Sequence, residues 1–210
     1  NKAWCREKEL IETGKSAVRE TVRSMGPSGV TFIYIRQPEP LGLGHAVLCA
    51  QPVVGDEPFA VMLADDLIDA QQSAIGQLIE ARKQLGGGNI LAVQDVPKAD
   101  TKKYGIVGVE DSLATTSLVH EMVEKPDPDH APSTLAVIGR YVLEPEIFKR
   151  LKKVQKGVGG EIQLTDAIAG QLNLNTTYSH RFDGIRYDCG SKQGFLDATV
   201  RFARKAGYSI

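Results

Sequence analysis

The chain has 210 residues, of which 42% are hydrophobic and 24% are charged, a composition sufficient for one sizeable globular core. Its formal net charge of -1 provides no broad positive field, which argues against a nucleic-acid partner. The three cysteines are too far apart for a disulfide framework or a metal knuckle, and no stretch reaches the roughly 18 to 20 apolar residues of a membrane span or forms an export signal, so we expect a soluble, cytoplasmic protein without a membrane partner.

Strand and helix signals alternate over the first half of the chain. Apolar spacing and glycine or proline breaks predict, in chain order, a broken helix at 4–25 interrupted at Gly14, a buried strand at 30–36, a helix at 45–50 ended by Pro52, a strand at 59–63, a helix at 72–85 and a strand at 90–96. Such alternation is typical of a Rossmann-like, three-layer α/β fold with a mainly parallel central sheet. In that architecture ligands bind at the carboxyl ends of the strands.

After Pro97 the predicted strands follow one another without long helices, so the sheet is expected to become mixed. The remaining predicted elements are strands at 104–110, 117–124 and 135–143, helices at 146–153 and 162–172, short strands at 177–182 and 185–187, and a closing amphipathic helix at 192–206. The most linker-like stretches, 127–133 and 155–160, are short loops, which favours a single domain over residues 1–210.

Two candidate ligand sites follow strands in the first half. Gln37 precedes the loop Gly42-Leu43-Gly44, whose backbone N–H groups a ligand can approach closely, and its amide could read a base edge; plain turn glycines are the structural alternative. Asp65 and Asp66 directly follow an apolar strand, where carboxylate oxygens suit Mg²⁺ with a phosphate co-ligand. A helix N-cap is the alternative for this pair, although Asp69 is the better candidate for the cap.

Three further candidates lie in the second half. Pro126 ends a strand and holds Lys125 there, where the ammonium could neutralise a sugar phosphate while Glu124 accepts hydrogen bonds from sugar hydroxyls; a solvated ion pair is the alternative. Asp188 lies between a short strand and a helix, and could complete a Mg²⁺ site or form a turn. Glu161 precedes a helix and could face a ligand, although helix capping by Thr165 or Asp166 explains part of the segment 159–166. The sequence has no Ser-His-Asp pattern, P-loop or His-rich motif to support hydrolase, P-loop kinase or zinc functions.

The order of these motifs is more specific than any one of them. The chain carries, in order, Gln37, LGLGHAV at 41–47, LAD at 63–65, YG at 104–105, EKP at 124–126, EIQLTD at 161–166 and DCG at 188–190. Together they resemble bacterial UTP–glucose-1-phosphate uridylyltransferases, from about Val30 to Phe202. The resemblance implies a cytoplasmic sugar nucleotidyltransferase of carbohydrate metabolism, with UTP and glucose-1-phosphate as substrates and UDP-glucose and pyrophosphate as products.

The resemblance also implies a role for each candidate residue. Gln37 and Gly42 would contact uracil, and Asp65 and Asp188 would hold the Mg²⁺ cofactor. The residues implied at the sugar and its phosphate are Gly105, Glu124, Lys125, Glu161 and, through backbone groups, Ala136 and Val137. The catalytic set would be Asp65, Lys125 and Asp188, acting by alignment and charge neutralisation without a protein nucleophile. Similar enzymes form dimers or tetramers, which implies a homo-oligomer.

The chain departs from the family pattern at its beginning. The family starts with a strand and a Gly-rich, Arg- and Lys-containing loop that cradles the triphosphate, and nothing before Val30 matches it. We therefore hypothesise that the 210-residue piece is inactive alone and that the full protein is active.

Two alternative functions remain. The first is a thymidylyl- or other sugar-1-phosphate nucleotidyltransferase, which a comparison of turnover with UTP and with dTTP would distinguish from a uridylyltransferase. The second is a non-catalytic nucleotide-sugar binding protein of the same fold.

Overall fold

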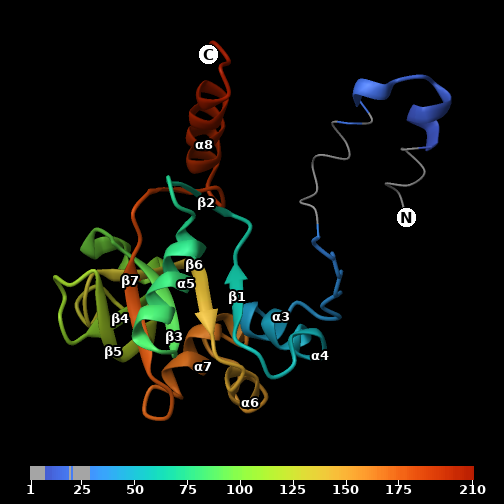
Figure 1. The fold of residues 1–210 in the computed structure, drawn as a ribbon. Helices are drawn as coiled ribbons and strands as arrows, with labels where there is room; N and C mark the ends of the chain where they lie inside the picture. The colour runs from blue at the N-terminus through green and yellow to red at the C-terminus, as the bar shows by residue number, and fades with distance from the viewer. Residues whose placement is uncertain (1–7, 19, 21–28) are drawn as a thin grey trace. The chain divides into compact units, whose positions relative to one another are not determined.

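The computed structural model describes residues 8–18, 20 and 29–210 (Figure 1). The chain divides into two compact units, Asn1–Arg36 and Gln37–Ile210. In the first unit residues 8–12 and 16–18 are helical, and Gly14 between them has a φ of 66°. The predicted broken helix is therefore confirmed where the structure describes it; the remainder of that prediction, at 4–7, 19 and 21–25, lies outside the described residues.

The predicted strand at 30–36 is wrong. Within the described part of the chain no strand pairs with this segment, and its side chains are exposed, Phe32 by 62% and Tyr34 by 93%. Strand propensity is largely a preference of β-branched and aromatic side chains for a pleated, half-buried surface. The composition of 30–36 satisfies that preference, but a strand also requires a neighbour to pair with.

The second unit is built on a six-stranded sheet with the order β1-β6-β3-β7-β5-β4. Its strands are β1 (Phe59–Met62), β3 (Asn89–Asp95), β4 (Gly105–Val109), β5 (Thr116–Glu124), β6 (Leu135–Leu143) and β7 (Thr177–Arg181). An additional pairing of Ile106 in β4 with Ala136 in β6 closes most of these strands into a small barrel. Strands β3 and β7 are parallel, and the other pairings in this sheet are antiparallel.

The expectation of a mainly parallel sheet is therefore wrong, and the reason lies in β6. Strands β1 and β3 do run in the same direction with a helix between them, as the alternation predicts. However, β6 lies between them and is antiparallel to both, pairing Phe59 with Leu143 on one side and Ile90 with Val142 on the other. Alternation fixes the direction of successive strands, but it does not determine which strand occupies the place between them.

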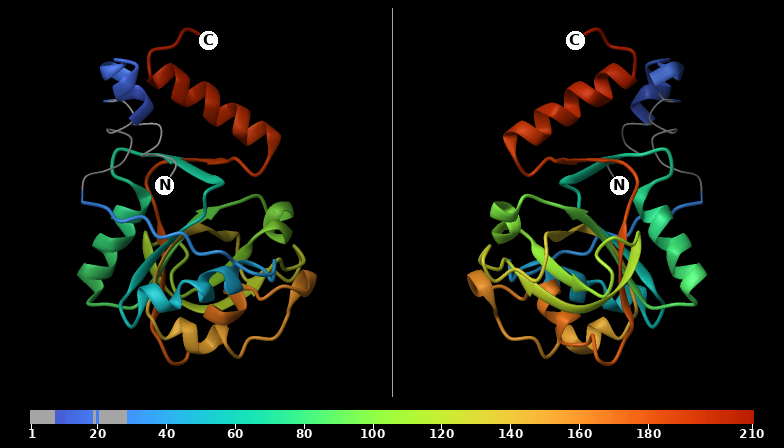
Figure 2. Two further views of the ribbon diagram at one scale, coloured as in Figure 1. Left: turned by 90° about the vertical axis from the view of Figure 1, so that its right-hand side faces the viewer. Right: turned by 90° about the vertical axis from the view of Figure 1, so that its left-hand side faces the viewer.

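Helices cover both faces of the sheet (Figures 1 and 2). The helices of this unit include α3 (Leu43–Cys49), α4 (Gln51–Val54), α5 (Ala74–Leu85), α6 (Ile147–Leu151), α7 (Leu164–Ala169) and α8 (Lys192–Lys205), of which α8 lies away from the sheet, with 3-10 turns η1 (Lys98–Lys103) and η2 (Val158–Gly160). On one face α3, α6 and α7 enclose a core that includes Phe148 and Leu91, and on the other α5 buries Leu78 against Ile90. Pro52 does not end the helical region as predicted, because it lies in the first turn of α4, where no intrahelical N–H is needed.

A two-stranded ribbon of β2 (Asp66–Asp69) and β8 (Ile185–Asp188) connects this body to α8 (Figure 1). Strand β2 was not predicted, and the prediction that Asp69 caps a helix is wrong. Asp69 lies in β2 and pairs with Arg201 and Lys205 of α8, whereas Ser73 caps α5 by accepting a hydrogen bond from the Gly76 N–H. In the part of the chain that the structure describes, no helix is long and apolar enough to cross a membrane.

Candidate functional site

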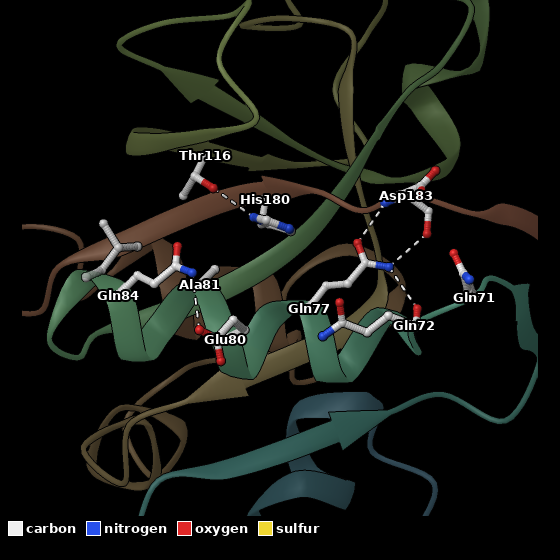
Figure 3. A pocket seen from close by; sticks show the side chains of 10 residues that line it. Gln71, Gln72, Gln77, Glu80, Ala81, Gln84, Thr116, His180 and Asp183 are labelled. Atoms are coloured by element: carbon white, nitrogen blue, oxygen red, sulfur yellow. Dashed lines mark hydrogen bonds between the residues drawn. The ribbon is translucent and has the colours of Figure 1, made fainter.

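Two cavities of the second unit differ in charge. The larger, about 550 Å³, lies beside α5 and β7 and is lined by four glutamines together with Glu80, Asp183, Thr116 and His180 (Figure 3). Among its lining residues there is no lysine or arginine and no predicted site residue. Because phosphate groups are bound through cationic donors or helix termini, this cavity does not suit a nucleotide or a sugar phosphate.

The second cavity, about 360 Å³, is lined by several of the predicted site residues. The predicted site residues among those that line it are Asp65, Gly105, Glu124, Lys125, Val137 and Asp188. Leu43 of the glycine loop and Gln163, close to Glu161 in the chain, line it as well. The structure thus brings together segments that are far apart in the sequence, as the resemblance implies.

Asp65 and Asp188 lie side by side at one end of the β2–β8 ribbon. The ribbon pairs Asp66 with Asp188, and the Cys189 N–H continues the pairing by donating to the Asp65 carbonyl at 2.7 Å. A Cβ placed on Gly190 would lie 3.1 Å from Asp188 Oδ1 and 3.5 Å from Asp65 Oδ2, so the two carboxylates converge on one place. Pairing in the ribbon, rather than proximity in the chain, creates this arrangement.

Asp66 is held differently from its neighbour. Its Oδ2 accepts a hydrogen bond from the Gly139 N–H at 2.9 Å, and its Oδ1 pairs with the guanidinium of Arg186. The side chain of Asp66 is 8% exposed. Because both oxygens of Asp66 already have partners within the protein, this geometry favours Asp65 over Asp66 as the carboxylate that serves a ligand.

The carboxylate pair suits a hard divalent cation with few protein ligands. Within the described residues, no group of three or more His, Cys, Asp or Glu side chains is arranged to hold a metal ion. Mg²⁺ is commonly bound through one or two carboxylates plus substrate phosphates and water. The donor set of Asp65 and Asp188 therefore fits Mg²⁺ bound together with a phosphate ligand.

The carboxyl end of β5 supplies Glu124 and Lys125. The β4–β5 ladder places Glu124 opposite Gly105, and a Cβ on Gly105 would lie 3.0 Å from Thr165 Oγ1 and 3.2 Å from Glu124 Oε2, so the absence of a side chain lets both groups approach this backbone closely. Lys125 has a φ of 48°, the one positive value among the described residues other than glycine. Residues that carry a side chain rarely adopt this backbone conformation. Backbone strain of this kind concentrates at functional sites. The Lys125 ammonium lies 3.6 Å from Glu124 Oε1 and is partly exposed.

A second cluster forms at the glycine loop. Gln37 donates from Nε2 to the Gly42 carbonyl at 3.1 Å, and the same nitrogen lies 2.9 Å from His45 Nδ1. A Cβ on Gly42 would lie 2.7 Å from the Cβ of Glu161, and the Ile162 N–H donates to the Leu41 carbonyl at 2.7 Å. The loop at 41–44 therefore packs against 161–162. Glu161 lies beside Gly42 and does not line the cavity of Asp65, and neither do Gln37 and Gly42.

Ala136 and Val137 of β6 occupy different positions. Ala136 is fully buried in the core beneath α5, so only its backbone could serve a ligand, as expected from the resemblance. Val137 lines the cavity, together with Tyr141, which lies four residues further along β6. Burial raises the pKa of the Tyr141 hydroxyl, and the carboxylates of Glu124, Asp66 and Asp65 add to the effect. Both effects favour the neutral hydroxyl of Tyr141.

Sequence reasoning missed several residues of the cavity. They are Lys103, Tyr104, Gln163, Thr165 and Arg186. Arg186 had a signal in the sequence, because it lies two residues before Asp188 on a predicted strand and so shares a face with it. Burial of its guanidinium opposes its charge, but hydrogen bonds to the Tyr104 hydroxyl and the Asp66 carboxylate outweigh burial, and the pKa of Arg186 is raised.

Comparison with known proteins agrees with the resemblance found in the sequence. A sequence profile described as nucleotidyl transferase matches residues 10–205. The chain is 46% identical over 199 residues to the UTP–glucose-1-phosphate uridylyltransferase of Bacillus subtilis, covering 94% of this chain and 67% of the relative. Among solved structures, UDP-glucose pyrophosphorylase complexed with UDP-glucose matches with a TM-score of 0.83 and 36% identity, over 92% of this chain and 73% of the other. The UTP-bound enzyme from Acinetobacter baumannii matches with a TM-score of 0.83 and 36% identity, over 96% and 70%.

Proposed function

The chain belongs to the nucleotidyl transferase family, with the α/β fold of its solved members, and we propose that it forms UDP-glucose by transferring the uridylyl group of UTP to glucose-1-phosphate. The observation that carries this proposal is the convergence of Asp65 and Asp188 in a cavity that also contains Lys125 and Glu124. The Bacillus subtilis relative is a uridylyltransferase, and the two matching solved structures contain UDP-glucose or UTP. Both reactants are anionic, so the site must bring like charges together.

In the proposed reaction a phosphate oxygen of glucose-1-phosphate attacks the α-phosphorus of UTP. One phosphorus–oxygen bond forms, the bond to the β-phosphate oxygen breaks, and pyrophosphate leaves. No protein nucleophile is consumed, and among the residues that line the cavity there is no serine or cysteine to provide one. Catalysis then depends on alignment of the reactants and on neutralisation of their charge.

Each group has a proposed task in this arrangement. Asp65 and Asp188 would hold Mg²⁺, whose chemistry when bound is to polarise and neutralise phosphate oxygens. Lys125 would place its ammonium at the sugar phosphate, while Glu124 accepts hydrogen bonds from sugar hydroxyls. The residues proposed around the sugar are Gly105, Val137, Glu161 and the backbone of Ala136. Gln37 and Gly42 would contact the uracil, since the Gln37 amide already lies against the glycine loop.

The test is release of pyrophosphate by the full natural protein with UTP, glucose-1-phosphate and Mg²⁺. Asp65→Asn keeps the shape of the side chain and removes one charge, so we expect at least a hundredfold loss of rate. Asp95→Asn is the matched control, because Asp95 is also a strand-end aspartate but pairs with Arg181 outside the cavity. Equal rates for the two variants, or no release from the unmodified protein with UTP, would contradict the proposal.

A further inference from the structure

Arg186 connects more segments of the cavity than any predicted site residue does. Its Nε pairs with Asp66 Oδ1, its NH1 lies 3.3 Å from the Tyr104 hydroxyl, and its NH2 lies 3.8 Å from Asp188 Oδ2. The guanidinium also lies 5.3 Å from the centre of the Tyr104 ring, within the range of a cation–π contact. One side chain of β8 therefore reaches β2, the end of η1 and its own strand end.

The carboxylate that Arg186 binds continues this connection into the central sheet. Asp66 Oδ2 accepts from the Gly139 N–H in the middle of β6. Gly139 has no room for a side chain there, because an added Cβ would lie 2.6 Å from Asp66 Oδ2 and 2.7 Å from the Leu63 Cβ. The chain Arg186–Asp66–Gly139 thus fixes the β2–β8 ribbon to β6.

The two candidate metal carboxylates adjoin two members of this chain of contacts, Asp66 and Arg186. Asp65 directly precedes Asp66, and Asp188 both follows Arg186 by two residues and lies opposite Asp66 in the ladder. The ladder fixes the spacing of the two backbones, and the Arg140 guanidinium also donates to the Leu63 and Asp66 carbonyls at this end of the ribbon. Side-chain direction at a ribbon end requires further contacts, because the last residues of a two-stranded ribbon are supported on one side only.

We propose that Arg186 is a positioning residue: through its bridge to Asp66 and its contact with Asp188 it holds the carboxylates of Asp65 and Asp188 at the spacing that a divalent cation requires. This inference rests on the proposed function, since it assumes that the two aspartates bind the metal. Arg186 acts on the reaction through these aspartates, as residues that orient metal ligands do in other metal sites.

Charge and geometry must be separated in the test. A guanidinium close to the metal also repels it, so replacing Arg186 by a neutral residue would mix two opposite effects. Arg186→Lys keeps the positive charge but replaces the planar fork, which can bind Asp66, Tyr104 and Asp188 together, by a single ammonium. Gly139→Ala is a second, charge-neutral change, because its Cβ would displace Asp66 Oδ2 from the same bridge.

Arg82→Lys is the matched control. Arg82 forms a partly buried ion pair with Glu144, at 2.5 Å, which does not line the cavity. All three variants are made in the full natural protein, and each is first examined by thermal unfolding. Mn²⁺, used as a probe for the Mg²⁺ site, is titrated without substrate and its affinity measured by electron paramagnetic resonance.

We expect Arg186→Lys and Gly139→Ala to weaken Mn²⁺ binding about tenfold or more, the range found when partners of metal ligands are replaced. The Mg²⁺ concentration that gives half the maximal rate should rise in parallel, while Arg82→Lys stays within about twofold of the unmodified protein. Unchanged Mn²⁺ affinity in a folded Arg186→Lys variant would overturn the inference, as would a loss of UTP affinity measured without metal, because Arg186 would then be a direct substrate contact. Failure of the proposed function is recognised separately, since the unmodified protein would then release no pyrophosphate.

Discussion

The strained backbone at Lys125 predicts that glycine stabilises this position relative to alanine. Lys125 has a φ of 48°, which costs a residue with a Cβ about 1 to 2 kcal/mol but costs glycine almost nothing. Glycine in turn lowers the free energy of unfolding by about 0.4 to 1 kcal/mol, because it makes the unfolded chain more flexible. The difference leaves Lys125→Gly about 1 kcal/mol more stable than Lys125→Ala. Both variants remove the ammonium, so the comparison isolates the backbone.

Urea unfolding of the two variants measures this difference, and in thermal unfolding it corresponds to about 2 to 4 °C for a chain of this size. Lys152 provides a control with the opposite sign. It caps α6 with a φ of -66° and a ψ of -18°, so Lys152→Gly should be about 0.5 to 1 kcal/mol less stable than Lys152→Ala. If Lys125→Ala proved as stable as Lys125→Gly, the strain at Lys125 would be refuted. If both variants retained full turnover, the proposed phosphate contact would be refuted as well.

Two further predictions concern the second unit away from the cavity of Asp65. Ser73→Ala should lower the free energy of unfolding by about 1 kcal/mol in urea, because the Gly76 N–H loses the Ser73 hydroxyl; an unchanged midpoint would contradict its role as the cap of α5. Burial lowers the pKa of His180, which lies 2.7 Å from the Thr116 hydroxyl and lines the same cavity as Glu80 and Asp183. The unfolded chain then binds more protons, so the stabilisation is greatest above the ordinary pKa of about 6.5 and decreases as the pH falls through it. Thermal unfolding at about pH 7.5 and 5 should show a smaller pH effect in His180→Gln than in the unmodified protein, and an equal effect would contradict this reading.

Local signals predicted most of the elements correctly. The strand at 135–143 agrees with β6 residue for residue, because a mostly apolar run, interrupted at Gly139 and Arg140, is bounded by polar loops. The helix α5 ends where Gly86 adopts the left-handed conformation, as the run of three glycines indicates. Such elements depend on their own residues and on burial of one face, and both are visible in the sequence.

The errors concern pairing between distant segments. The strand at 30–36 lacks a partner, β6 enters between β1 and β3, and β2 exists because it pairs with β8 more than a hundred residues later. Asp69 looked like a helix cap because an aspartate before a helix usually is one, yet its partners lie on α8. Arg186 was missed for the same reason: its value to the site depends on Asp66 and Tyr104, which only the folded chain brings near it.

Several predicted site residues share one cavity although the sheet was predicted wrongly, and the strand ends explain why. Asp65 follows β1, Lys125 follows β5 and Asp188 ends β8, so three chain segments reach the cavity at carboxyl ends of strands. The antiparallel β4–β5 ladder then adds the amino end of β4, because Gly105 lies opposite Glu124. A carboxyl end therefore lies next to an amino end, which places the Glu124 carboxylate beside Gly105. The mixed sheet therefore brings charged strand ends and the amino end of β4 to one cavity, whereas in an entirely parallel sheet the amino ends would lie at the opposite edge.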